Sequence, residues 1–158
     1  MFKFLRLREA DLPMVLAWRT KPRVADVMLT KVTNDMEAQL RWFRGIKEPY
    51  WVIHSPDKPI GLINFSENSF GFYIGEDDAV PLGGLVLPYF YNHVFKTWDA
   101  LRAEVMDHNV GAIRLHKFHG YIETGWSHPK GRTTHLLLTR YAWEQQASRY
   151  GHMLAEFE

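Results

Sequence analysis

Three short apolar and aromatic runs in the middle of this chain constrain its fold more than any other feature. They cover residues 50–54, 60–65 and 70–74, and turn-forming residues separate them at 56–57 and 67–69. Short runs rich in β-branched and aromatic residues, with turn signals between them, are typical of an antiparallel β-meander. The sequence therefore predicts that a sheet of neighbouring strands lies at the centre of the fold.

The remaining periodicity predicts helices and further strands around this meander. Residues 2–8 predict a first strand, and Asp11 favours the start of a helix directly after it. A second helix is expected to begin at Asn34 or Asp35, because Asn34 and Glu37 have the spacing of a capping box. The second half is expected to contain helices at 84–96 and 109–119 and strands at 101–106, 121–126 and 132–139.

Together these elements predict an α/β fold in which a mixed, mostly antiparallel central sheet of about seven strands is flanked by helices. No linker, repeat or low-complexity segment divides residues 1–158, so we interpret them as a single domain. The polar segment 141–158 is expected to be a C-terminal extension that forms one more helix.

Composition excludes several classes of protein. The absence of cysteine excludes disulfide frameworks, thiolate metal sites and a cysteine nucleophile. The formal net charge is +1 with both signs scattered, so we expect neither nucleic-acid binding nor a membrane-surface segment. The charged N-terminus lacks the apolar core of a signal peptide, and no apolar run approaches the roughly 20 residues of a membrane span. We therefore expect a cytoplasmic protein.

A Gly-Gly pair lies between the last run of the meander and the next helix, within residues 80–85. Free N–H groups at a helix start, with glycines that let an anion approach, make a pyrophosphate cradle. The alternative is an ordinary tight strand-to-helix turn. Asp77 and Asp78 place negative charge beside this turn, and Pro88 falls in the first turn of a helix capped near Gly84.

Two other segments contain candidate chemistry. The strand at 101–106 alternates so that Glu104 lies on its polar face, as a base or as a solvated residue. In the following helix, Asn109 is a plausible N-cap, and His116 and His119 share one helix face. His108 is close in sequence, but no third ligand has convincing zinc spacing, so we predict no metal site.

These segments together resemble the GNAT superfamily of acyl-CoA-dependent N-acetyltransferases. The segment at 109–125 resembles the family pattern N-x-x-A-I-x-L-Y-E-K-L-G-F-x-x-x-G, and the opening LREADLPMVLAWRTKP resembles the family's first strand and helix. Four stretches, at 18–22, 27–30, 85–95 and 101–109, look most like the aminosugar N-acetyltransferases of pseudaminic acid biosynthesis.

The resemblance implies acetyl-CoA as co-substrate. In such enzymes the fourth strand splays from the fifth, its exposed backbone pairs with the pantetheine arm, and the pyrophosphate lies on N–H groups at the next helix start. The family's usual loop carries an arginine that this chain lacks. The implied cofactor-binding residues are Phe72, Tyr73, Ile74, Leu82, Gly83, Gly84, Leu85 and Asn109.

The resemblance also implies direct attack of an amine on the thioester. Glu104 is at the position of the base in related ribosomal-protein N-terminal acetyltransferases. His116 is where the family usually has the tyrosine that protonates the leaving thiolate, and a neutral imidazole still has one N–H to offer the sulfur. The alternative is that His116 is a helix-surface histidine and that transfer proceeds without a dedicated acid.

The acceptor expected from the subgroup resemblance is a small-molecule amine, a nucleotide-linked (UDP) 4-aminosugar. Two alternatives stay open: a protein N-terminus, small amine or antibiotic as acceptor, and a non-catalytic domain that binds acyl-CoA or a protein partner. The aromatic C-terminal segment is compatible with a homodimer. The candidate acceptor-binding residues are Trp18, Met28, Trp42, Tyr50 and Trp51.

Overall fold

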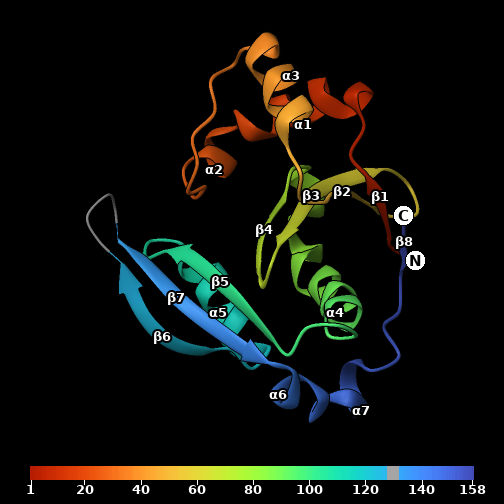
Figure 1. Cartoon of the computed structure of the whole chain (residues 1–158), viewed down its shortest axis with the longest axis vertical. Helices are drawn as coiled ribbons and strands as arrows, with labels where there is room; N and C mark the ends of the chain where they lie inside the picture. The colour runs from red at the N-terminus through yellow and green to blue at the C-terminus, as the bar shows by residue number, and fades with distance from the viewer. Residues whose placement is uncertain (128–131) are drawn as a thin grey trace. The chain divides into compact units, whose positions relative to one another are not determined.

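The computed structural model describes residues 1–127 and 132–158 and divides into two compact units. Unit 1 comprises residues 1–66, 71–83 and 155–158, and unit 2 comprises residues 67–70 and 84–154. Figure 1 labels the helices and strands of both units.

The strands of unit 1 confirm the predicted meander. They are β1 (Lys3–Arg6), β2 (Tyr50–His54), β3 (Pro59–Ser66), most of β4 (Ser69–Ile74) and β8 (Glu156–Phe157). β2 pairs antiparallel with both β1 and β3, whereas β8 pairs parallel with β1. The alternation of side chains places Val52, Leu62 and Tyr73 in one buried cluster with residues of the N-terminal helices.

The helical segments of unit 1 cover that apolar cluster. They are η1 (Glu9–Asp11), α1 (Leu12–Arg19), α2 (Pro22–Ala25), α3 (Met36–Gly45) and η2 (Asp77–Leu82). In α1, Leu12, Val15 and Trp18 recur at helical spacing and are buried, which explains why this segment is helical. Figure 1 shows α1, α2 and α3 grouped together.

Two details of these helices differ from the sequence-based expectation. The N-cap of α3 is Asp35, whose carboxylate accepts hydrogen bonds from the backbone N–H groups of Glu37 and Ala38, so the predicted Asn34 capping box is wrong. α2 was not predicted, because Pro22 suggested an end. Proline at a first helical position instead starts this short helix.

Unit 2 contains the second half of the predicted elements. They are α4 (Gly83–Val94, all but its first residue), β5 (Ala100–Met106), α5 (Val110–Phe118), β6 (Ile122–Ser127), β7 (Thr133–Thr139), α6 (Arg140–Glu144) and α7 (Ala147–Tyr150). β7 pairs antiparallel with β5 on one side and with β6 on the other. Leu101, Leu136 and Leu138 of these strands are fully or almost fully buried.

All eight strands belong to one mixed, mostly antiparallel sheet, in the order β6-β7-β5-β4-β3-β2-β1-β8. β4 and β5 pair in parallel at Ser69 and Arg102. The predicted fold class is therefore confirmed. The sheet has one strand more than expected, because the tail at 141–158 forms two short helices and then β8.

Among the described residues, no helix combines the length and apolar character that a membrane crossing requires.

Candidate functional site

The segment before α4 is more helical than the expected turn. Residues 77–82 form η2, and α4 begins directly at Gly83, one residue before the predicted cap. The Gly83 N–H is bonded to the Val80 carbonyl, whereas first-turn N–H groups of an α-helix have no partner within the helix. Because the helix starts at Gly83, Pro88 is its sixth residue and not part of the first turn as predicted.

Basic side chains neutralise the acidic pair beside this helix start. Asp77 Oδ1 lies 2.9 Å from an Arg23 nitrogen and 3.4 Å from Lys21 Nζ, and Asp78 Oδ2 lies 2.8 Å from Lys58 Nζ. Hydrogen bonds from Arg23 and Lys21 hold the pKa of Asp77 below its usual value. Asp77 and Asp78 are therefore matched by three cations of unit 1, and their negative charge argues less against phosphate binding than the sequence suggested.

The predicted pantetheine strand, β4, presents its residues on two sides. Phe72 and Ile74 both have side-chain atoms 3.7 Å from where a Cβ on Gly83 would lie, so they border the end of η2. Tyr73 points the other way and packs edge-on against Trp18 with ring centroids 6.3 Å apart. Burial raises the pKa of Tyr73. The side chains of Phe72 and Ile74 therefore lie on the side of β4 that faces Gly83, whereas the Tyr73 side chain lies on the opposite side, in the core.

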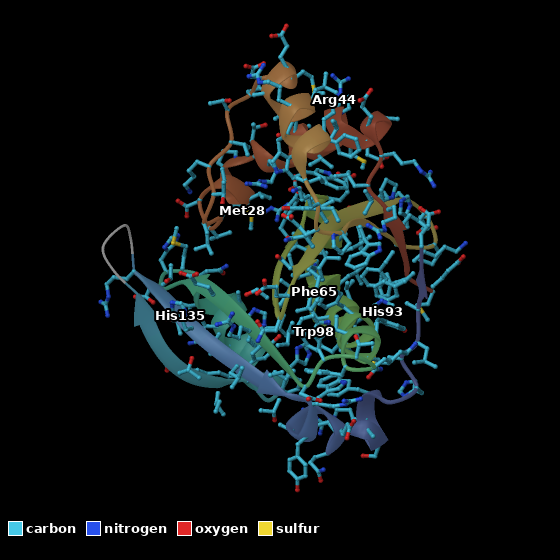
Figure 2. The ribbon with its side chains drawn as sticks, viewed as in Figure 1. Met28, Arg44, Phe65, His93, Trp98 and His135 are labelled. Carbon is cyan, nitrogen blue, oxygen red and sulfur yellow. The ribbon has the colours of Figure 1, made fainter. Side chains whose placement is uncertain are left out.

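Glu104 lies on the polar face of β5, as predicted, but it has two neighbours that the sequence did not identify. Thr133 Oγ1 donates a 2.6 Å hydrogen bond to Glu104 Oε2, and His135 Nε2 lies 3.6 Å from the same oxygen. His135 is directly opposite Glu104 in the β5–β7 register and is labelled in Figure 2. The pairing register that unites them could not be read from sequence alone, since β7 follows β5 only after a helix and another strand.

His116 is buried in unit 2, with 6% of its surface exposed, so the interpretation as a helix-surface histidine is wrong. Its ring centroid lies 4.9 Å from that of Tyr121 and 5.9 Å from that of Phe70. Burial lowers the pKa of His116 to about 4, and the nearby His119 makes a smaller contribution in the same direction. Its Nδ1 has no hydrogen-bond partner among the described residues. The side chain is therefore a neutral imidazole at neutral pH.

Asn109 has the capping role that its position predicted. Its side-chain oxygen accepts a hydrogen bond from the backbone N–H of Ala112 at 3.4 Å, at the start of α5. The side-chain amide also has N–H groups, and the residue is partly exposed. Asn109 can therefore cap α5 and still offer a donor to a ligand.

Four of the five acceptor-binding candidates lie in one cluster of unit 1. Trp18 is one of the buried residues of this cluster, and Met28, which Figure 2 labels, packs against the cluster together with Trp42 and Tyr50. The rings of Trp42 and Tyr50 pack edge-on at 5.1 Å. Trp51 does not join them: it projects from the other side of β2, and its indole N–H donates to the backbone carbonyl of Glu158.

No group of three or more His, Asp or Glu side chains within residues 1–127 and 132–158 is arranged to hold a metal ion.

The chain is similar to known proteins both in sequence and in fold. No family model matches the chain. By sequence it is 25% identical to the acetyltransferase PseH of Campylobacter jejuni subsp. jejuni serotype O:2 over 125 residues, which is 72% of this chain and 78% of that protein. By fold it is similar to the aminoglycoside acetyltransferase AAC(6')-Ib in complex with coenzyme A, with a TM-score of 0.77, 15% identity, and 92% and 98% of the two chains covered.

The chain has the GNAT acetyltransferase fold. A spermidine N-acetyltransferase SpeG chimera, from Vibrio cholerae and hSSAT, is also similar, with a TM-score of 0.73, 13% identity, and 90% and 98% of the two chains covered. These similarities confirm the resemblance to GNAT enzymes that the sequence showed. The predicted enzyme class, an acetyl-CoA-dependent N-acetyltransferase, agrees with these relatives.

Proposed function

We propose that this chain transfers an acetyl group from acetyl-CoA to the primary amine of a nucleotide-linked 4-aminosugar. The observation that carries the proposal is the sequence similarity to the acetyltransferase PseH, which extends over most of both chains. The quoted stretches of resemblance to aminosugar N-acetyltransferases support the choice of acceptor.

In this proposal the start of α4 binds the pyrophosphate of acetyl-CoA. Gly84 and Leu85 contribute first-turn N–H groups, where a helix end favours an anion. Leu82 and Gly83 bring the chain into this turn, and the ion pairs of Asp77 and Asp78 reduce the repulsion that a phosphate would otherwise meet. The backbone of Phe72, Tyr73 and Ile74 is proposed to pair with the pantetheine arm, and the Asn109 amide is proposed to donate to it.

Glu104 and His116 are proposed to move the protons of the reaction. The acceptor nitrogen attacks the thioester carbonyl carbon, the new C–N bond forms, and the C–S bond breaks. Glu104 takes the proton that the amine loses, and the Thr133 hydroxyl holds its carboxylate in one orientation. A neutral His116 offers its N–H to the leaving sulfur.

The aromatic cluster of unit 1 is proposed to contact the acceptor. Met28, Trp42 and Tyr50 are partly buried and pack against the cluster that contains Trp18, so they combine apolar area with a phenol hydroxyl. Such a surface suits a planar base or the apolar face of a sugar. We do not extend this proposal to Trp51, which lies on the other side of β2. The cytoplasmic location and a homodimer stay predictions.

The similarity in fold to other acetyltransferases favours a second candidate function, with a different acceptor. The fold neighbours include an aminoglycoside acetyltransferase solved with coenzyme A and kanamycin, and a spermidine N-acetyltransferase chimera. An aminoglycoside or polyamine amine is therefore the alternative acceptor. A protein N-terminus is the third candidate acceptor.

Two measurements test the proposal. Acetyl-CoA should raise the melting temperature, because a ligand that binds only the folded state stabilises it. CoA thiol should then be released only when an amine is added. If acetyl-CoA causes no shift in melting temperature and no amine causes thiol release, the chain is a non-catalytic domain. If acetyl-CoA causes a shift but no amine causes thiol release, the chain is a non-catalytic domain that binds acyl-CoA.

A further inference from the structure

The pairing of β7 with its two neighbouring strands places the His135 ring next to the Glu104 carboxylate. His135 lies directly opposite Glu104 of β5 and directly opposite Gly125 of β6. Directly opposed residues of paired strands point to the same face of a sheet, and glycine has no side chain to offer there. Of the two residues directly opposite His135, which Figure 2 labels, Glu104 is therefore the one whose side chain can meet the imidazole.

The Nε2 atom of His135 is buried beside that carboxylate. It lies 3.6 Å from Glu104 Oε2 and has no hydrogen-bond partner among the described residues. A buried nitrogen without a partner is costly, so it requires a polar group nearby. A lone pair on Nε2 would face the lone pairs of the carboxylate and repel them, so the proton of the neutral ring belongs on Nε2. His135 is therefore a donor next to an acceptor.

Two donors thus lie beside one oxygen of Glu104. The Thr133 hydroxyl donates a 2.6 Å hydrogen bond to Oε2, and His135 Nε2 is 3.6 Å from the same atom. The longer distance exceeds that of a hydrogen bond, but catalytic hydrogen bonds are often long before substrate binds and tighten in the substrate complex. Both groups therefore act on Oε2, and the other carboxylate oxygen, Oε1, is the one that they leave for a further proton.

We propose that His135 is a positioning residue for Glu104: together with Thr133 it holds Oε2, so that Oε1 takes the proton from the acceptor amine. In this step one N–H bond of the amine breaks and one O–H bond forms on Oε1. His135 neither gains nor loses a proton and does not touch the substrate. A carboxylate held at one oxygen presents the other in a fixed direction, on which proton transfer depends. This inference rests on the proposed function, because it takes Glu104 as the base.

Substitutions at position 135 separate the donor from the rest of the ring. Glutamine places an amide N–H close to where histidine has Nε2, whereas the shorter asparagine places it close to Nδ1. H135Q should therefore keep most of the wild-type kcat, whereas H135N and H135F should lower kcat about 5–10-fold, the effect of one hydrogen bond. KM for acetyl-CoA should stay within about twofold of the wild type, because the cofactor does not contact His135. CoA thiol release is the readout, with a UDP-linked 4-aminosugar, kanamycin and spermidine as amines.

A double-variant cycle shows whether His135 acts through Glu104. In the E104Q background H135F should change kcat less than about twofold, because the carboxylate that His135 orients is already absent. L137A is the matched control, since Leu137 is two residues along β7, on the same face, and lies opposite Arg102. L137A should retain the wild-type kcat even if its melting temperature falls.

Three results would overturn the inference alone: a wild-type kcat for H135F, a loss in H135Q as large as that in H135F, or a loss from H135F that persists in the E104Q background. The third result would show that His135 has only a structural role. If H135F does not fold, the comparison of H135Q with H135N decides in the same way. If the wild type releases no thiol with any of the three amines, the proposed function fails together with the inference.

Discussion

The Thr133 hydroxyl reaches across from β7 to donate a 2.6 Å hydrogen bond to the Glu104 carboxylate on β5. The bond joins residues on diagonal positions of two paired strands, next to the directly opposed His135. A carboxylate held in this way has a defined direction although 40% of its side chain is exposed. Glu104 is therefore better oriented than an ordinary solvated strand residue.

We predict that Glu104→Gln lowers kcat about 100-fold, because the amide keeps the shape of the side chain but cannot accept the amine proton. The dissociation constant of CoA should change little. Thiol release and calorimetric titration measure the two effects. Glu123→Gln, on β6 of the same unit and paired with Lys117, is the matched control and should retain wild-type turnover. Full turnover in Glu104→Gln would remove Glu104 from the mechanism.

Gly84→Asp should abolish the increase in melting temperature that acetyl-CoA produces. The added carboxylate lies in the first helical turn, where it favours the helix itself but repels a phosphate. Gly84→Ala is the control for size: its Cβ meets only Leu115 Cδ1 at 3.2 Å, so most of the acetyl-CoA effect should remain. A normal acetyl-CoA shift in Gly84→Asp would locate the phosphate elsewhere.

His116→Phe should lower turnover and leave CoA binding nearly intact, because phenylalanine fills the pocket beside Tyr121 and Phe70 but has no N–H for the leaving sulfur. His116→Tyr should retain much of the activity through its phenol. Since burial lowers the pKa of His116 to about 4, the wild-type rate should show no decline from His116 titration between about pH 6 and about pH 8. Near-native rates for both variants would show that the side chain has no part in the transfer.

The two buried histidines should make the free energy of unfolding depend on pH. His116 and His119 have pKa values of about 4 in the folded state and about 6.5 when unfolded. Between these values the unfolded chain binds more protons, so stability is fully present above about pH 6.5 and is lost as the pH falls toward about 4. Across this pH range, the titration of each histidine changes the free energy of unfolding by at most about 3 kcal/mol.

Urea unfolding at a series of pH values measures this dependence. His116→Phe should flatten the acid limb, whereas the exposed His152→Gln should follow the wild type. An acid limb of equal slope in all three proteins would mean that other groups cause it.

The sequence-based predictions were most accurate where structure is determined locally. The alternation in residues 50–54 and 101–106 gave strands within one residue of the observed bounds, and the Asn109 cap was located correctly. β8 was missed because a two-residue strand has no period of its own. It forms because Phe157 stacks on Phe4 at 4.2 Å and Glu158 binds the N–H of Arg6, contacts that join the two ends of the chain.

The candidate site was predictable in its residue types but not in their surroundings. The charges of Asp77 and Asp78 were visible, but Arg23 and Lys58, which neutralise them, come from segments far away in sequence. His119 was noticed only as a neighbour of His116, because its edge-on contacts with Tyr91 and Trp143 depend on how the end of α5 packs against α4 and α6. Such partners follow from tertiary packing, which no local pattern contains.

The most direct test of the proposed function is a comparison of kcat/KM for different acceptors at saturating acetyl-CoA. The panel contains a UDP-linked 4-aminosugar, the same sugar without the nucleotide, kanamycin, spermidine and a peptide with a free N-terminus, and CoA thiol release is the readout. We predict that kcat/KM for the UDP-linked aminosugar exceeds every other value by about 100-fold or more. A higher value for kanamycin, spermidine or the peptide, or no thiol release with any member of the panel, would contradict the proposed function.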